Sequence, residues 1–130
     1  MNLLLDTCAL LWLASGDPQL DESARQRIQQ ASIVYVSVLS GFEVALKWRR
    51  GKLTLPAAAD DWFTTVVEHH GLTPAPLDLA DAMRAPQLPD IHRDPCDRFI
   101  IATALRLGVP VVTKDPHFSA YGLTVIGQEG

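Results

Sequence analysis

The chain has 130 residues, a net charge of −4, 48% hydrophobic residues and 20% charged residues. This length fits one folding unit, so we expect a single domain over residues 1–130. The hydrophobic content supports a packed core and excludes a largely disordered chain, and the negative charge argues against a general nucleic-acid coat protein. No apolar run approaches the roughly 18 residues of a membrane span, so we expect a cytoplasmic protein without a membrane segment.

The first half of the chain predicts two strands and three helices. In chain order these are a strand over 2–6, a helix over 7–14, a helix over 21–30, a strand over 33–36 and a helix that reaches Arg50. The predicted strands are short apolar or β-branched runs. The helices start near capping or acidic residues. For the third helix, Ser37 and Ser40 are alternative caps.

The second half continues the alternation of helices and strands. Its predicted elements are a helix from Pro56 to about His69, a short strand over 72–74, a helix from Asp78 to Arg84, a loop between Pro86 and Pro89, a helix from Asp94 to Leu107, a strand over 109–113, a turn or short helix over 117–121 and a strand over 123–126. Gly71 and Gly108 each follow a helix, as C-terminal caps do. Alternating strands and helices predict a parallel sheet covered by helices on both faces.

Four acidic residues lie far apart in the chain, each near the end or the start of a predicted element: Asp6, Glu43, Asp97 and Asp115. Because the carboxyl ends of parallel strands meet at one edge of a sheet, we expect these acids to share a pocket. Clustered carboxylates do not stay ionised together unless a cation neutralises them. Mainly oxygen ligands and no obvious His or Cys cluster predict Mg²⁺ or Mn²⁺, and a metal-dependent phosphoryl-transfer enzyme.

Helix capping is an alternative explanation for three of these acids. Asp6 lies between a predicted strand and a helix, Asp97 lies in a first helical turn that Asp94 caps, and Asp115 precedes Pro116. Glu43 fits this explanation less well, because it lies on the apolar stripe of its helix, where carboxylates are rarely buried without a partner. Lys47, one turn later, is its ordinary alternative partner.

The remaining reactive side chains give weaker signals. Cys8 and Cys96 form no disulfide framework or zinc pattern, so we interpret them as reduced thiols, with an oxidation-sensitive pair as the alternative. The four histidines, His69, His70, His92 and His117, are interpreted as surface or loop residues outside the chemistry. Among them His92 is the first to test.

Four segments carry the candidate acids in order along the chain. They are Leu4-Leu5-Asp6-Thr7, Val36-Ser37 with Glu43 to Lys47 and Gly51-Lys52-Leu53, Asp94-Pro95-Cys96-Asp97-Arg98, and Val112-Thr113-Lys114-Asp115. Essentially end to end, the chain resembles the PIN-domain ribonucleases and, more narrowly, the VapC-like toxins of type II toxin–antitoxin systems. It departs from the common pattern at Cys8, where His is frequent, at Cys96, where Phe is frequent, and at Phe42, where Trp is frequent.

The resemblance implies a three-layer α/β/α domain with a short, mostly parallel sheet of about five strands. It implies an endoribonuclease, acting on transfer or ribosomal RNA, in which Asp6, Glu43, Asp97 and Asp115 surround Mg²⁺ or Mn²⁺. The hydroxyls expected near this shell are Thr7, Ser37 and Thr113. The side chains expected to hold the RNA backbone are Arg49, Arg50, Lys52, Arg93 and Arg98. The implied partners are an antitoxin protein and a second copy of the chain in a homodimer.

Two alternatives remain beside this interpretation. Aspartyl-phosphate phosphatases also place an acid after the first strand, but they need a second acid two residues later, where this chain has Cys8. The other alternative is a non-catalytic PIN-like module that binds a partner, whose acidic cluster receives an arginine from the antitoxin. The basic run from Lys47 to Lys52 equally fits a helix end or contacts with phosphate groups.

Overall fold

Five short strands form one parallel sheet in the computed structural model, which describes residues 1–127. The strands are β1 (Asn2–Leu5), β2 (Ile33–Ser37), β3 (Thr73–Ala75), β4 (Val111–Val112) and β5 (Val125–Ile126). Their order is β3-β2-β1-β4-β5, and each neighbouring pair is parallel. Leu4 of β1 lies opposite Tyr35 on one side and Val111 on the other. The short parallel sheet of the sequence prediction is therefore confirmed.

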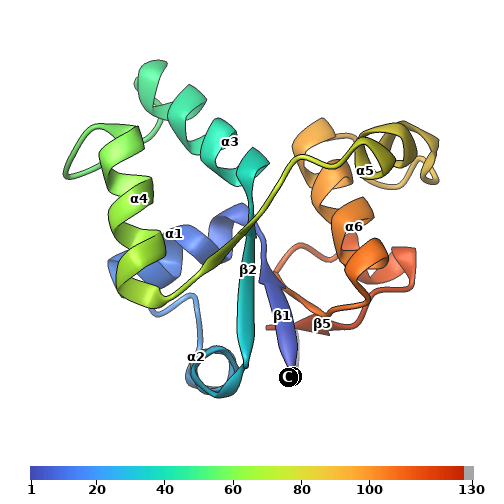
Figure 1. Cartoon of the computed structure of the whole chain (residues 1–130), viewed down its shortest axis with the longest axis horizontal. Helices are drawn as coiled ribbons and strands as arrows, with labels where there is room; N and C mark the ends of the chain where they lie inside the picture. The colour runs from blue at the N-terminus through green and yellow to red at the C-terminus, as the bar shows by residue number, and fades with distance from the viewer. Residues whose placement is uncertain (128–130) are drawn as a thin grey trace.

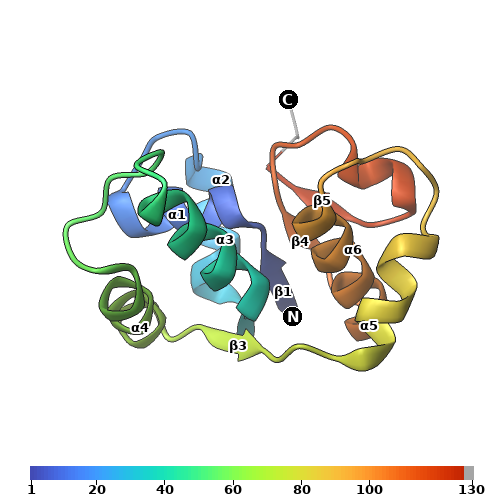
Figure 2. The same ribbon diagram turned by 90° about the horizontal axis from the view of Figure 1, so that it is seen from above.

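Six α-helices and two short 3₁₀ helices connect these strands in the described part of the chain. They are α1 (Thr7–Ser15), α2 (Glu22–Gln30), α3 (Val38–Arg49), α4 (Ala59–His70), α5 (Leu79–Arg84), η1 (Ala85–Gln87), α6 (Pro95–Leu107) and η2 (Phe118–Tyr121). Figure 1 and Figure 2 show α1, α2 and α4 on one side of the sheet and α5 and α6 on the other. The three layers match the predicted α/β/α architecture. Among residues 1–127, no helix has both the length and the apolar character needed to cross a membrane.

The apolar run of β1 forms the centre of both hydrophobic layers. Leu3 and Leu5 belong to the core with α1, α2 and α4, and Leu4 belongs to the core with α6. All three side chains are fully buried. Successive side chains of a strand point to opposite faces, so a central strand covered on both faces must be apolar at every position. This accounts for the uninterrupted leucine run that ends at Asp6.

The helix starts follow the capping residues of the sequence. The side chains that accept a hydrogen bond from a first-turn N–H are Asp6, Asp21, Ser37, Asp78 and Asp94. Of the two alternative caps for α3, the structure has Ser37. Helix α4 differs from the prediction, because it begins at Ala59 and not at Pro56. No side chain caps this helix, and its first turn instead holds Asp60 and Asp61, whose charges favour a helix start.

The predicted loop after α5 contains the 3₁₀ helix η1, and Arg98 of α6 organises this segment. Arg98 is only 8% exposed. Its guanidinium group donates hydrogen bonds to five carbonyl oxygens of the segment 85–92, those of Ala85, Pro86, Leu88, Pro89 and His92. The RNA-binding role predicted for Arg98 does not fit this arrangement, because the donors that would bind a phosphate are already occupied inside the fold.

We expect Arg98→Met to lower the free energy of unfolding by about 2–4 kcal/mol, because it leaves several carbonyl groups without their hydrogen bonds. Urea denaturation of the purified protein measures this change. Arg93→Met is the matched control, since Arg93 is exposed on the same segment, and its effect should stay within about 0.5 kcal/mol. Equal effects of the two substitutions would contradict the role given to Arg98.

Candidate active site

The four predicted acids line one cavity of about 500 Å³ at the carboxyl edge of the sheet. Asp6 follows β1 directly, Glu43 comes from α3, Asp97 from the first turn of α6, and Asp115 from the loop after β4. The other residues that line the cavity are Thr7, Cys8, Trp12, Lys47, Asp94, Lys114, Pro116 and His117. The convergence expected from the strand ends is therefore present in the structure.

Asp6 both caps a helix and lines the cavity. Its Oδ1 accepts a hydrogen bond from the N–H of Ala9 at 2.8 Å, which is the cap of α1. Burial raises the pKa of this carboxyl to about 6, although hydrogen bonds from Thr113 and Ala9 act in the opposite direction. Asp6 is therefore a helix cap, as the alternative explanation holds. Capping alone does not account for its burial beside the other acids of the cavity.

Glu43 lies across the cavity and is held by two donors. The hydroxyl of Thr7 donates to its Oε1 at 2.8 Å, and Nζ of Lys47 donates to its Oε2 at 2.9 Å. The ordinary partner Lys47 is thus present, and this hydrogen bond raises the pKa of the lysine. Thr7 also shares a hydrogen bond of 2.9 Å with Ser40. These contacts hold Glu43 at the cavity, although α3 follows β2 and Asp6 follows β1.

Asp97 has the most strongly perturbed carboxyl of the cavity. Burial is the largest cause and, with the negative charge of Asp94, raises the pKa of Asp97 to about 7, while His92 acts to lower it. Asp94 accepts from the N–H of Cys96 at 2.9 Å, which confirms its predicted place as the cap of α6. At neutral pH the metal-free pocket therefore holds Asp97 partly protonated.

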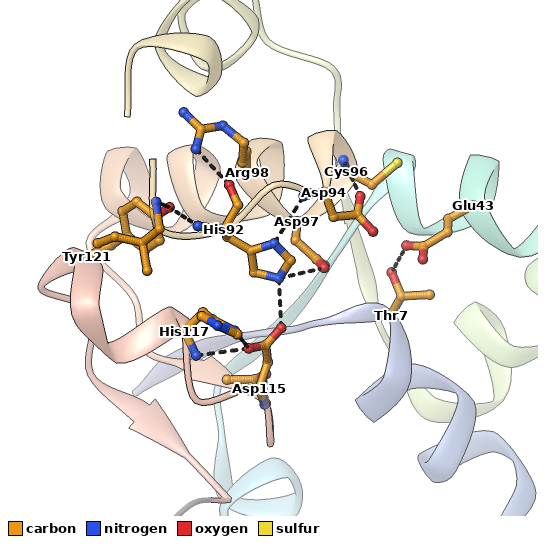
Figure 3. A network of polar contacts seen from close by, with 12 residues as sticks. Thr7, Glu43, His92, Asp94, Cys96, Asp97, Arg98, Asp115, His117 and Tyr121 are labelled. Carbon is orange, nitrogen blue, oxygen red and sulfur yellow. Dashed lines mark hydrogen bonds and ion pairs between the residues drawn. The ribbon is translucent and has the colours of Figure 1, made fainter. Parts of the chain in front are cut away.

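Asp115 is surrounded by hydrogen-bond donors. Its Oδ2 lies 2.7 Å from Nε2 of His92, and its Oδ1 accepts from the backbone N–H of His117 at 2.9 Å and lies 2.8 Å from Nδ1 of that residue (Figure 3). Burial alone would raise the pKa of Asp115, but the hydrogen bonds from His117 and His92 outweigh it and hold this pKa below its ordinary value. Its backbone N–H donates to Oγ1 of Thr113 at 3.0 Å.

The predicted hydroxyl residues separate into two groups. Thr7 and Thr113 contact acids of the cavity, as expected. Ser37 is buried, and its Oγ accepts from the N–H of Leu39 at 3.0 Å as the cap of α3. In the described part of the chain no hydrogen bond joins Ser37 to the four acids, and it does not line the cavity. The contacts of Ser37 therefore do not support its predicted place near the metal-binding acids.

Two histidines contact the acids of the site, and these contacts were not predicted from the sequence. His92 and His117 lie in loops, as predicted, but both contact Asp115, and Nε2 of His92 also lies 3.1 Å from Oδ2 of Asp97. The available signal was proximity in the chain, because His92 comes two residues before Asp94 and His117 two residues after Asp115. His69 and His70 lie on α4, away from the lining of the cavity.

Cys8 is exposed and lines the cavity, whereas Cys96 lies in the first turn of α6 and does not line it. Burial raises the pKa of Cys8 to about 11 and that of Cys96 to about 11, with neighbouring carboxylates adding to both shifts. A thiol becomes a nucleophile or a readily oxidised group as its thiolate, which is scarce so far below its pKa. The raised pKa values therefore favour reduced thiols over an oxidation-sensitive pair.

The predicted RNA-binding residues lie outside the cavity. Arg49, Arg50, Lys52 and Arg93 are exposed, as a backbone contact requires. None of them lines the cavity, whereas Lys47 and Lys114 do. Lys47 belongs to the basic run for which phosphate contacts were one of two predicted alternatives, whereas no RNA contact was predicted for Lys114.

Comparisons with known proteins agree with this geometry. A model of the PIN domain matches residues 3–123. Ribonuclease VapC22 of Mycobacterium tuberculosis is 31% identical over 123 residues, which cover 92% of each chain. This chain belongs to the PIN-domain family. The resemblance stated from the sequence motifs is thereby confirmed.

Solved structures of similar fold include other PIN-domain proteins in complexes. The DNA-bound VapBC2 of Rickettsia felis aligns with a TM-score of 0.70 at 12% identity, covering 97% of this chain and 98% of that one. The DNA-bound VapBC of Salmonella typhimurium aligns with a TM-score of 0.70 at 20% identity and 97% coverage of both chains. FitAcB of Neisseria gonorrhoeae aligns with a TM-score of 0.67 at 20% identity, covering 95% of this chain and 96% of that one. At these identities the alignments establish the PIN fold.

The donor set of this PIN-domain cavity fits a divalent cation. Carboxylate oxygens of four residues face one space, and burial, with the negative charges of neighbouring acids, raises the pKa values of Asp6 and Asp97. A hard cation with oxygen ligands would offset the burial and the mutual repulsion of these carboxylates. In the described part of the chain, His92, Asp115 and His117 also bring one potential ligand atom each within 4.8 Å of the others.

The raised pKa of Asp97 predicts a pH-dependent stability of the metal-free protein. The folded state holds this proton up to about pH 7, whereas the unfolded chain releases it near 3.8, so stability falls as the pH rises through this interval. Asp97→Asn lacks the titrating group. Its melting temperature relative to the unsubstituted protein should therefore rise through the same interval and then level off, when both are measured in EDTA.

Glu68→Gln is the control for this measurement, because Glu68 is an exposed acid on α4. Its melting temperature should follow that of the unsubstituted protein at every pH. A constant difference for Asp97→Asn between about pH 4 and pH 8 would show that Asp97 does not titrate differently in the folded and unfolded states.

Proposed function

We propose that this protein is a metal-dependent endoribonuclease that acts as the toxin of a toxin–antitoxin pair, with one nuclease domain spanning the chain. The observation that carries the proposal is the convergence of Asp6, Glu43, Asp97 and Asp115 in one open cavity. The relative named as a ribonuclease, similar over nearly the whole chain, supports the same activity. The proposed substrate is transfer or ribosomal RNA.

In this proposal the four acids hold Mg²⁺ or Mn²⁺. When bound, the cation would offset the charge of the scissile phosphodiester and lower the pKa of the attacking water. Thr7 orients Glu43, and Thr113 hydrogen-bonds Asp6, so both hydroxyls limit the rotation of the ligands. A cavity that opens to solvent admits a strand of RNA without rearrangement of the core.

The basic residues have separate roles in this mechanism. Lys47 and Lys114 line the cavity, where their ammonium groups attract the phosphate that enters it. Arg49, Arg50, Lys52 and Arg93 are exposed and would contact the sugar–phosphate backbone on either side. Contacts of this kind add affinity without base specificity.

The proposed partners are an antitoxin protein and a second copy of this chain. The structural neighbours come from complexes named VapBC and FitAB, which supports a protein partner of the same kind. Sedimentation at micromolar concentration tests the homodimer, which a purely monomeric species would exclude. If the acids instead receive an antitoxin arginine without catalysis, the purified protein will bind its partner and cleave no RNA.

Cleavage of total and transfer RNA by the partner-free protein tests the activity. With Mg²⁺ or Mn²⁺ we expect discrete fragments that disappear in EDTA, and Asp6→Asn or Asp97→Asn should reduce the rate by about 100-fold or more through loss of charge stabilisation. Expression of Asp6→Asn should also fail to arrest growth. Growth arrest by a folded Asp6→Asn protein would contradict metal-dependent cleavage as the cause of toxicity.

Arg49→Ala combined with Arg50→Ala should weaken RNA binding more at low salt than at high salt. Each lost phosphate contact on a single strand lowers the slope of log K against log salt by about 0.7, so the pair should lower it by roughly 1.4. Fluorescence anisotropy with labelled RNA, in the inactive Asp97→Asn background, measures this slope. Arg27→Ala with Arg84→Ala is the control of equal charge, and an equal loss of affinity at all salt concentrations would indicate a folding defect.

A further inference from the structure

His92 lies between two acids of the cavity. Its Nε2 is 2.7 Å from Oδ2 of Asp115 and 3.1 Å from Oδ2 of Asp97, and its side chain is only 13% exposed. Figure 3 shows the imidazole between these two carboxylates, with both dashed contacts on the same nitrogen. One nitrogen therefore contacts acids from two different segments, α6 and the loop after β4.

The other ring nitrogen identifies which atom carries the proton. The backbone N–H of Asp94 donates to Nδ1 of His92 at 3.1 Å, so the lone pair of Nδ1 is in use and Nδ1 carries no hydrogen. A neutral imidazole then has its hydrogen on Nε2, the atom that faces Asp97 and Asp115. His92 thus donates this hydrogen to Oδ2 of Asp115, and the same Nε2 lies 3.1 Å from Oδ2 of Asp97.

The surrounding segment fixes the ring in this orientation. The backbone N–H of His92 donates to the Tyr121 hydroxyl at 2.7 Å, and its carbonyl accepts from Nη1 of Arg98 at 2.8 Å. The ring also contacts Phe118 and His117 edge-on, with centroid distances of 5.8 Å and 5.4 Å. Backbone and ring are therefore both held, and the N–H group has little freedom to leave the two acids.

We infer that His92 is a positioning residue of the proposed metal centre: its Nε2–H holds Asp97 and Asp115 in the arrangement that receives the cation. The Nε2–H group donates to Oδ2 of Asp115 and lies close to Oδ2 of Asp97, so it sets the distance between the two carboxylates. Donors that orient ligating carboxylates commonly contribute 10–100-fold to metal affinity. The inference rests on the proposed function and adds a residue outside its four acids.

A direct role of His92 as a metal ligand is the competing explanation, since His92, Asp115 and His117 are grouped closely enough. Ligating histidines ordinarily donate their second ring N–H to a neighbouring acceptor. Here the second nitrogen accepts a hydrogen bond, so coordination through Nε2 would require loss of a proton or of the bond from Asp94. The geometry favours the donor role.

Titration calorimetry of the full chain with Mn²⁺ and Mg²⁺ tests the inference without measuring catalysis. His92→Phe keeps an aromatic ring but removes the donor, and it should weaken Mn²⁺ binding by about 10–100-fold. His92→Gln keeps an N–H donor at similar reach and should recover most of that affinity. His69→Phe, an exposed histidine on α4, is the matched control and should bind as the unsubstituted protein does.

The unsubstituted protein offers a second measurement that depends on no variant. Nitrogen-15 spectra of its imidazoles should show His92 protonated at Nε2 both before and after addition of Mg²⁺. A metal-coordinated Nε2, or equal losses of affinity in His92→Gln and His92→Phe, would overturn the positioning role in favour of direct ligation.

The outcomes also separate this inference from the proposed function. If the unsubstituted protein binds Mn²⁺ and His92→Phe binds it equally well, the role of His92 is wrong while the metal centre stands. If the unsubstituted protein binds neither cation at millimolar concentration, the metal centre itself is wrong and the role of His92 falls with it.

Discussion

The repulsion between carboxylates gathered over the carboxyl edge of the sheet is the constraint on which the rest of this site depends. A parallel sheet brings strand ends together whatever their charge, and here it brings acids together. The surrounding residues limit the cost of that repulsion. Asp115 receives donors from two histidines and stays ionised, whereas Asp6 and Asp97, with fewer donors for their burial, have raised pKa values. Asp6 and Asp97 are therefore the acids that a bound cation would stabilise most.

The packing on the far side of α6 supports the same site. Arg98 fixes the carbonyl groups of the segment 85–92, and this segment ends at His92. Two consecutive residues of α6 therefore have different roles. Asp97 lines the cavity, and Arg98 holds the segment 85–92 that ends at His92. The geometry of His92 relative to Asp97 is thus determined by α6, its neighbouring loop and η2, and not by α3 or α4.

Much of the fold follows from local patterns, and the differences arise where distant contacts decide. Strand ends and caps predicted the positions of Asp6, Asp97 and Asp115, because both effects act within a few residues. The role of Arg98 was not predictable in this way, since an arginine in a helix start resembles a surface residue until the carbonyl-rich loop packs on it. The contact of His92 with Asp115 was not predicted for the same reason, because it spans 23 residues of sequence.

The cap formed by Asp6 also restricts which ions suit the cavity. Because Oδ1 of Asp6 already accepts the N–H of Ala9, coordination through both oxygens of Asp6 would compete with this hydrogen bond, and Oδ2 of Asp97 has Nε2 of His92 at 3.1 Å. Monodentate carboxylates leave a bound ion with most of its hydration shell. Such a site suits a small ion that retains water, as Mg²⁺ does, and it disfavours Ca²⁺, which uses six to eight oxygen ligands and often a bidentate carboxylate. In the proposed metal centre, the hydrogen bond that starts α1 would thus favour coordination by one oxygen of Asp6.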